Sequence, residues 1–253
     1  MIENIDLNIF FEKDPKAMEA IKVVNNTEKL IRNRNSKYSN FCINNIPEND
    51  ERVLSLFSGG ITDNIYGYDS EETKIILQLV NPIKFTDLIA IYALCKPPIS
   101  FMSIAKFICA KNGNIDNCLC QYVNEICDET YGMIVYSEQV INIINSLSGY
   151  PIKEAIIFQK ETSKLKCENT KKQIDKFCNY ALTIGLTKEK TDKVIKIAYE
   201  TTGCSKKSDS IPYAILGYQM GYLKKYFNEE FKMTIKHIFK DKICETDISL
   251  NDI

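Results

Sequence analysis

Several residue types are scarce in this sequence, and each scarcity excludes a class of function. The only histidine is His237, near the C-terminal end of the sequence, so Ser-His-Asp and Cys-His catalysis have no support. Gly59-Gly60 is not followed by Lys-Ser or Lys-Thr, which excludes a phosphate-binding P-loop at that point. Only three arginines are present, so nearly all the positive charge is lysine, which meets a phosphate as a point charge. Because the net charge is −1, any nucleic-acid binding has to use a local patch.

Long apolar runs are missing as well. No run approaches the roughly 20 residues that a membrane-spanning helix needs. Met1–Phe11 lacks a basic start followed by an apolar stretch, so the sequence predicts no secretory signal. The ten cysteines are scattered through helical patterns, as expected of small apolar residues in a reducing cytosol. Cys118, Cys120 and Cys127 lack a fourth ligand at a suitable spacing, so no zinc site is expected. The sequence therefore predicts a cytoplasmic protein without a membrane segment.

What the sequence does contain is helical periodicity over most of its length. Thr86 and Thr187 are candidate N-caps, and Gly149 and Gly185 are candidate helix ends. The segment 61–70 alternates apolar and polar residues, which indicates a short extended piece or hairpin. The fold class predicted is mainly α with a minor β element. The helices expected are 17–31, 54–60, 86–94, 99–111, 135–147, a helix with Pro151 in its first turn, 168–183, 188–200, 211–227 and 228–239, with a frayed tail after them.

Three blocks of residues resemble one protein family. Tyr131-Gly-Met-Ile-Val-Tyr-Ser-Glu-Gln-Val-Ile141 is similar to the signature Y-G-I-I-V-Y-Q-E-Q-V-M of bacterial DNA polymerase III alpha subunits. Asn81–Leu94 looks like the stretch that leads into the family's A-L-Y-R-P-G-P motif. Ile211–Lys224, with Asn228–Phe231, resembles a helix pair of the same family. The blocks keep the family's order and spacing over roughly residues 12–239, so the chain resembles a detached, truncated fingers-region segment of that polymerase.

The resemblance implies a domain organisation. Residues 1–50 would be an N-terminal helical segment resembling the end of the palm domain. Residues 51–240 would form a fingers-like helical domain, and 241–253 a frayed tail. In this family the fingers help to hold the incoming nucleotide and the templating end of the duplex.

The resemblance also implies a set of phosphate-binding residues, because a triphosphate carries charges that basic side chains must neutralise. Arginine and lysine positions of the family motifs are matched by lysines here. Several other positions depart from the family: Gln159 and Asp209 replace an arginine and a histidine, Gly67 a glutamine and Pro98 a glycine. These departures predict a weakened grip on phosphate. The nucleotide- and phosphate-binding residues implied are Lys74, Lys96, Lys160, Lys164, Lys207 and Ser208.

Catalysis by this family needs carboxylates of the palm that hold two metal ions. Only the third of those carboxylates has a counterpart, Asp14, and its neighbours Lys13, Pro15 and Lys16 do not match the family motif. A lone surface aspartate in front of a helix is the more ordinary interpretation of this residue. Because one carboxylate cannot hold two metals, the chain alone is expected to be inactive as a DNA-directed DNA polymerase. It is expected to have no cofactor alone, and Mg²⁺ only if a palm partner completes the site.

Two further patterns each allow two interpretations. The lysine-rich stretches 153–176 and 188–207 could line a groove for a nucleic-acid backbone, or form solvated helix faces with pairs such as Glu168–Lys172. A stripe of tyrosines could stack on bases or pack in the core, and core packing is favoured. The stripe consists of Tyr213, Tyr218, Tyr222 and Tyr226.

Three functional hypotheses follow. The first is a non-catalytic module that binds primer–template DNA or a deoxynucleoside triphosphate during DNA replication. The second is a split polymerase that needs a separate palm subunit as its partner. The third is a decayed fragment repurposed for protein interaction, with apolar surface exposed where the palm once packed.

Overall fold

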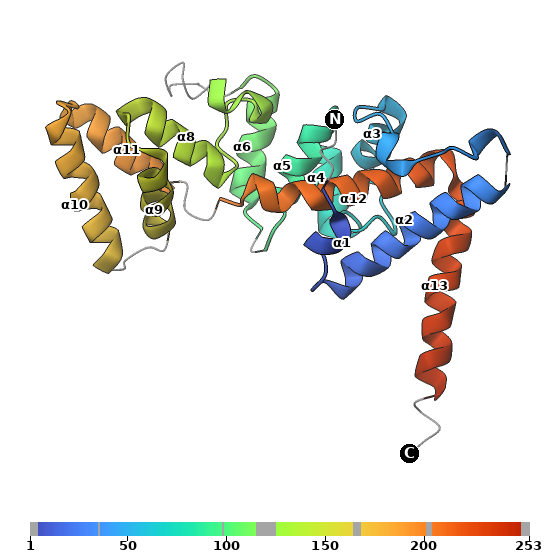
Figure 1. Cartoon of the computed structure of the whole chain (residues 1–253). Helices are drawn as coiled ribbons and strands as arrows, with labels where there is room; N and C mark the ends of the chain where they lie inside the picture. Colours follow the sequence, from blue (N-terminus) through green and yellow to red (C-terminus); the bar gives the residue numbers. More distant parts are fainter. Residues whose placement is uncertain are drawn as a thin grey trace. The chain divides into compact units, whose positions relative to one another are not determined.

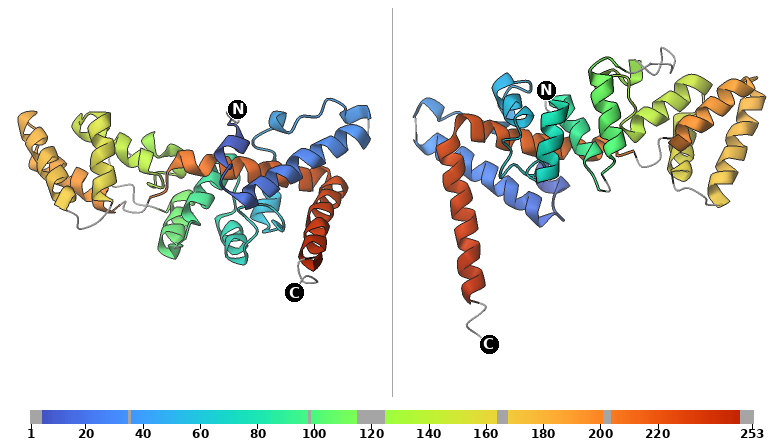
Figure 2. Two further views of the ribbon diagram at one scale, coloured as in Figure 1. Left: turned by 60° about the horizontal axis from the view of Figure 1, so that its bottom comes forward. Right: turned by 180° about the vertical axis from the view of Figure 1, so that it is seen from behind.

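The protein folds into helices joined by turns, as the computed structural model in Figure 1 and Figure 2 shows. The structure describes residues 5–34, 36–97, 99–114, 125–163, 168–200 and 204–248. Within these ranges no strand forms, and extended pairing is limited to one parallel bridge between Tyr136 and Ser205. The mainly helical prediction is therefore confirmed. The α-helices are α1 (Leu7–Phe10), α2 (Pro15–Arg34), α3 (Glu51–Ser58), α4 (Glu71–Val80), α5 (Phe85–Leu94), α6 (Phe101–Lys111), α8 (Ser137–Ser148), α9 (Ile152–Thr162), α10 (Glu168–Thr183), α11 (Lys188–Glu200), α12 (Lys207–Tyr226) and α13 (Asn228–Ile248), and the 3₁₀ turns are η1 (Ser36–Tyr38), η2 (Ile43–Asn45) and η3 (Asp128–Thr130).

The chain divides into two compact units. Unit 1 consists of Met1–Leu88 and Ile211–Ile253, and unit 2 of Ile89–Ser210. The division expected from the family, with borders at residues 50 and 240, concerns palm and fingers and stays a prediction. Among the described helices, none combines the length and the apolar character required to cross a membrane.

In unit 1, two glycines of α12 let aromatic rings pack directly on the helix backbone. A Cβ at Gly217 would lie 2.5 Å from the Tyr68 ring, and one at Gly221 would lie 2.7 Å from the Phe57 ring. Both rings are fully buried, and the Tyr68 hydroxyl donates to the Leu88 carbonyl at 2.9 Å. The long helices α2 and α13 also pack on each other (Figure 1). The core of unit 1 therefore depends on the close approach of aromatic rings to α12.

In unit 2, α8, α9, α10 and α11 pack around one apolar core. Gly149 ends α8 in the left-handed conformation, at a φ of 66°, which a glycine adopts without steric cost. The Tyr180 hydroxyl donates to the Gly149 carbonyl at 2.8 Å and ties this turn to α10. The most deeply buried side chains of this core are Cys127, Val140, Ile144, Ala155, Phe158, Phe177 and Val194.

Helix positions follow the sequence prediction in most places. The prediction of 168–183 matches α10, and Thr187 does cap α11, accepting from the Lys190 amide at 3.4 Å. Thr86 is not a cap, because α5 already begins at Phe85. The helix α4 was not predicted, and α13 runs past the predicted end at Phe239 to Ile248.

The short extended piece or hairpin predicted for 61–70 is wrong. This segment is a turn-rich loop, closed by a hydrogen bond from the Thr62 hydroxyl to the Tyr68 carbonyl at 2.5 Å. Ile65 and Tyr68 are both fully buried. Two inward side chains three positions apart suit a turn and break the period of two that a strand requires.

Candidate phosphate-binding residues

Asp14, the expected third palm carboxylate, caps a helix. One of its carboxylate oxygens accepts from the Ala17 amide at 3.1 Å, at the start of α2. The other accepts from the Tyr66 hydroxyl at 2.6 Å. Burial, followed by this hydrogen bond, raises the pKa of Tyr66 well above its ordinary value. A helix cap and a hydrogen bond from Tyr66 together account for both oxygens of Asp14.

The described residues do not fit a two-metal centre. Among them, no group of three or more His, Cys, Asp or Glu side chains is arranged to hold a metal ion. Cys118 and Cys120, the pair of the C-x-C motif, lie outside the described residues. Cys127 is buried, and this burial raises the pKa of its thiol to about 12.

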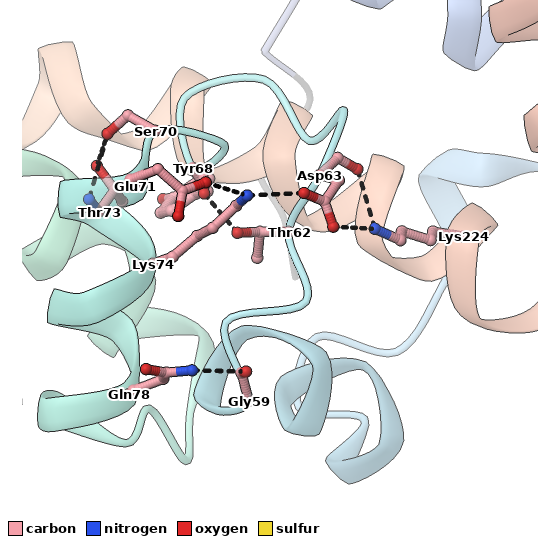
Figure 3. Close-up of polar contacts among 10 residues, drawn as sticks. All are labelled: Gly59, Thr62, Asp63, Tyr68, Ser70, Glu71, Thr73, Lys74, Gln78 and Lys224. Atoms are coloured by element: carbon pink, nitrogen blue, oxygen red, sulfur yellow. Dashed lines mark hydrogen bonds and ion pairs between the residues drawn. The ribbon is translucent and has the colours of Figure 1, made fainter.

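Lys74 lies in unit 1, in a cluster that also contains a second lysine. Its ammonium is 2.7 Å from a carboxylate oxygen of Asp63 and 2.7 Å from one of Glu71 (Figure 3). Lys224, from α12, donates to the Asp63 carbonyl at 2.9 Å and lies 3.9 Å from its other carboxylate oxygen. Two ammonium groups from different helices therefore converge on one loop aspartate.

The charged groups in this cluster shift one another's pKa. The hydrogen bonds to Asp63 and Glu71 raise the pKa of Lys74. Burial lowers the pKa of Lys224, and the nearby ammonium groups of Lys74 and Lys232 lower it further, although Asp63 opposes them. The Lys74 hydrogen bond holds the pKa of Asp63 below its ordinary value. The two lysines therefore repel each other, and the aspartate offsets that repulsion.

Lys96, Lys207 and Ser208 are brought together in unit 2, around Glu138. The Glu138 carboxylate accepts from the backbone amide of Lys207 at 2.9 Å and from that of Ser208 at 3.1 Å. It also accepts from the Ser208 hydroxyl at 3.2 Å. These contacts place a negative charge at the N-terminus of α12, where the helix dipole favours an anion. An internal carboxylate is thus bound by Lys207 and Ser208, two residues that the family resemblance assigned to phosphate binding.

The electrostatic balance of this cluster is unfavourable for another anion. The Lys207 ammonium forms an ion pair with Glu129 at 2.6 Å. Burial lowers the pKa of Lys96, although Asp209 and Glu138 oppose this. Burial on its own would raise the pKa of Glu138, but the Lys207 and Ser208 amides outweigh it and the net shift is downward. Two lysines therefore face three carboxylates, and the weakened phosphate grip expected from Asp209 stays a prediction.

The remaining predicted residues lie apart from these two clusters. Lys160 is exposed at the end of α9, and the described part of the chain provides no ion pair for its ammonium. Lys164 lies outside the described residues. Of the surrounding charges, Glu168 and Lys172 form the predicted i,i+4 pair at 3.0 Å, and Lys176 pairs with Glu154. The lysine-rich helices are therefore partly neutralised, and Lys160 remains exposed among them.

The tyrosine stripe of α12 packs within the protein. Tyr218 is fully buried, and its hydroxyl donates to the Pro47 carbonyl at 2.7 Å and accepts from the Asp50 amide at 2.9 Å. The Tyr226 hydroxyl donates to the Asp50 carboxylate at 2.7 Å. Tyr222 stacks on the Phe41 ring. The core-packing interpretation is confirmed for Tyr218, whereas Tyr222 is half-buried and Tyr226 is 38% exposed.

Several residues of the two clusters escaped the sequence interpretation. Glu138 stands within the signature block at 131–141, and Lys224 ends the block at 211–224, so both had a signal that was not used. Asp63 and Glu129 carry no recognisable motif, and only the fold brings them to Lys74 and Lys207.

Comparison with known proteins leads to the same family as the three sequence blocks. Residues 20–185 match the family model described as the bacterial DNA polymerase III alpha subunit finger domain. The chain is 30% identical over 221 residues to the DNA polymerase III subunit alpha of Treponema pallidum, a match that covers 85% of the chain. It is 29% identical over 234 residues to that of Campylobacter jejuni, covering 91% of the chain. The matched parts are 18% of the first relative and 19% of the second, so the chain spans about a fifth of their length.

Proposed function

Because this chain belongs to the bacterial DNA polymerase III alpha family through its finger domain, we propose that it is a DNA- and nucleotide-binding module of DNA replication that does not join nucleotides by itself. The observation that carries this proposal is the finger-domain match itself, which includes α9 and α10 with their exposed lysines. The proposal places the protein in the cytoplasm with primer–template DNA and deoxynucleoside triphosphates as ligands. Mg²⁺ enters it only with a separate partner that supplies palm carboxylates.

Exposed lysines support backbone binding in preference to sequence reading. Lysines on α9, α10 and α11 outnumber the acidic residues of the same helices by nine to seven. Lysine side chains neutralise phosphates and release condensed counterions, which gives binding that ignores sequence and weakens as salt rises. The net charge of −1 provides no long-range attraction to add to this small local excess. We therefore expect weak, strongly salt-dependent binding to primer–template DNA.

The test is a fluorescence-anisotropy titration of primer–template DNA at two salt concentrations. Lys160→Glu should weaken binding and lower the slope of log affinity against log salt by about one. Lys29→Glu is the matched control, because Lys29 is exposed on α2 and the change in net charge is the same. Equal effects of the two substitutions, or wild-type binding that does not change with salt, would contradict the proposal.

A second candidate function is protein interaction, which exposed apolar residues favour. Ile75 and Leu79 lie one turn apart on α4 and are 56% and 61% exposed, and Ile83 beyond the helix is 63% exposed. Apolar surface of this kind marks interaction sites in many proteins. A palm-bearing polymerase partner that covers this face would unite this candidate with the split-polymerase hypothesis. Primer extension that appears only when such a partner is added, and is lost in Leu79→Glu, is the expected result.

A further inference from the structure

The cluster around Asp63 differs from a simple surface ion pair because its two lysines are mostly buried and its aspartate is exposed. The side chains of Lys74 and Lys224 are each only 17% exposed, whereas that of Asp63 is 62% exposed. The lysine stems are therefore packed into unit 1 from two different helices, and only the acidic partner reaches into solvent (Figure 3). The positions of the two cations are set by the fold, and the anion between them is carried by a loop.

Asp63 is an imperfect partner for both lysines at once. One carboxylate oxygen lies 2.7 Å from Lys74, but the other lies 3.9 Å from Lys224, which instead donates to the Asp63 carbonyl. A carboxylate carries one charge on two oxygens. A terminal phosphate group, as in pyrophosphate or a nucleotide, presents three oxygens and more negative charge than a carboxylate, so it can accept from two ammonium groups simultaneously. A phosphodiester of DNA carries one charge on two free oxygens, so it would gain less from replacing Asp63.

The structure assigns Lys74 and Lys224 to a phosphate-binding site. In the absence of a ligand, the Asp63 carboxylate lies between the two ammonium groups, where the phosphate would bind. The assignment rests on the proposed function for the source of the phosphate, which is either the DNA backbone or the triphosphate of a nucleotide. Asp63 limits the affinity because a ligand has to displace its carboxylate. It also keeps the two ammonium groups from repelling each other while the site is empty.

The loop that carries Asp63 is anchored on both sides of this residue. Thr62 is fully buried and donates to the Tyr68 carbonyl, and Asn64 adopts a left-handed φ of 62°. Rotation of the Asp63 side chain towards solvent therefore needs no rearrangement of the core. The second acidic neighbour, Glu71, lies 2.7 Å from the Lys74 ammonium and is 82% exposed, so a ligand has to compete with Glu71 as well as with Asp63.

The test measures phosphate binding at this loop in Asp63→Asn. Pyrophosphate, dATP and primer–template DNA are each titrated into the full chain, and the backbone amide resonances of residues 63 and 64 are followed by NMR. Asp63→Asn should tighten pyrophosphate binding by up to about fivefold, because the competing charge is removed. Lys224→Met, which keeps an apolar stem of similar length, should abolish the shifts at these amides.

Glu12→Gln is the control, since Glu12 is exposed in unit 1 and its substitution changes the net charge by the same amount. Equal tightening in Glu12→Gln and Asp63→Asn, or shifts that avoid residues 63 and 64, would overturn the assignment. Shifts with dATP alone identify a nucleotide site, and shifts with DNA alone identify a backbone site. DNA binding that depends on Lys160 without pyrophosphate binding at Asp63 refutes the site only. Pyrophosphate binding at Asp63 in a chain that binds neither DNA nor dATP refutes the proposed function only.

Discussion

At the scale of the residue, carboxylates fix the first turns of helices in both units. Asp14 and Asp50 cap α2 and α3 from the preceding position, which is the usual arrangement. Glu138 reaches the start of α12 from another helix, 69 residues earlier in the chain. In each case the charge satisfies backbone amides that lack partners within their own helix.

Glu138→Gln should destabilise the protein by about 1–3 kcal/mol near neutral pH, because one oxygen that accepts from a backbone amide is replaced by an NH₂ donor. Since the folded pKa of Glu138 lies below its ordinary value, the stabilisation is present above that ordinary value and is lost as the pH falls through the folded pKa. Urea unfolding of both variants at about pH 7 and about pH 3.5 measures this. The difference should shrink at the lower pH. Asp175→Asn, an exposed change on α10, should show no such trend. A constant difference for Glu138→Gln would contradict the stabilisation of the start of α12 by the Glu138 carboxylate.

The structural role of Asp14 as the cap of α2 can be tested directly. Asp14→Ala removes the cap of α2 and the partner of the Tyr66 hydroxyl, so it should cost about 1–2 kcal/mol in unfolding free energy. Asp14→Asn keeps a side-chain oxygen that can cap the helix, so its cost should be clearly smaller. Thermal unfolding followed by circular dichroism tests both variants. Wild-type stability in Asp14→Ala would show that the cap is not needed.

At the scale of the element, α12 places glycines against aromatic rings. On helix propensity alone, glycine to alanine in a helix interior is favourable by about 1 kcal/mol. Gly217→Ala should nevertheless destabilise the protein by about 1–3 kcal/mol, because the added Cβ would lie 2.5 Å from the Tyr68 ring and 3.2 Å from the Tyr66 carbonyl. Chemical unfolding measures the net effect. Gly113→Ala is not a matched control, because its φ of 72° adds backbone strain.

The double substitution Gly217→Ala with Tyr68→Leu supplies the control, since the smaller side chain makes room for the methyl group. The cost of Gly217→Ala should fall in that background. A stabilising Gly217→Ala in the wild-type background would mean that propensity outweighs packing here.

At the scale of the whole molecule, periodicity and capping residues predict where helices lie, whereas the sites depend on contacts between distant residues. Thr187 and Gly185 mark the borders of α11 and α10 because capping is local chemistry. Lys224 and Asp63 are 161 positions apart, and Lys207 and Glu129 are 78 apart, so no local pattern connects them. The family resemblance predicted Lys74, Lys96 and Lys207 as binding residues, but it could not indicate which acidic side chain each one meets.

The missed helix α4 and the wrong hairpin have the same origin. Ser70 caps α4 by accepting from the Thr73 amide, and two glutamates follow it in the first turn, which is a recognisable start signal. Alternating residues just before Ser70 gave a competing extended pattern. Burial of Tyr68 under α12 decided the conformation of that loop, and burial of this kind is a tertiary effect.

The reach of Glu138 also limits which residue can stand at position 138. Aspartate would bring the same charge, but its chain is one methylene shorter, so its carboxylate would stop short of the two amides that begin α12. Exchange between the two acidic amino acids is harmless on most protein surfaces. At this position the helix start requires the length of the side chain as well as its charge. A substitution normally regarded as conservative, glutamate to aspartate, would therefore lose the contact between Glu138 and the first amides of α12.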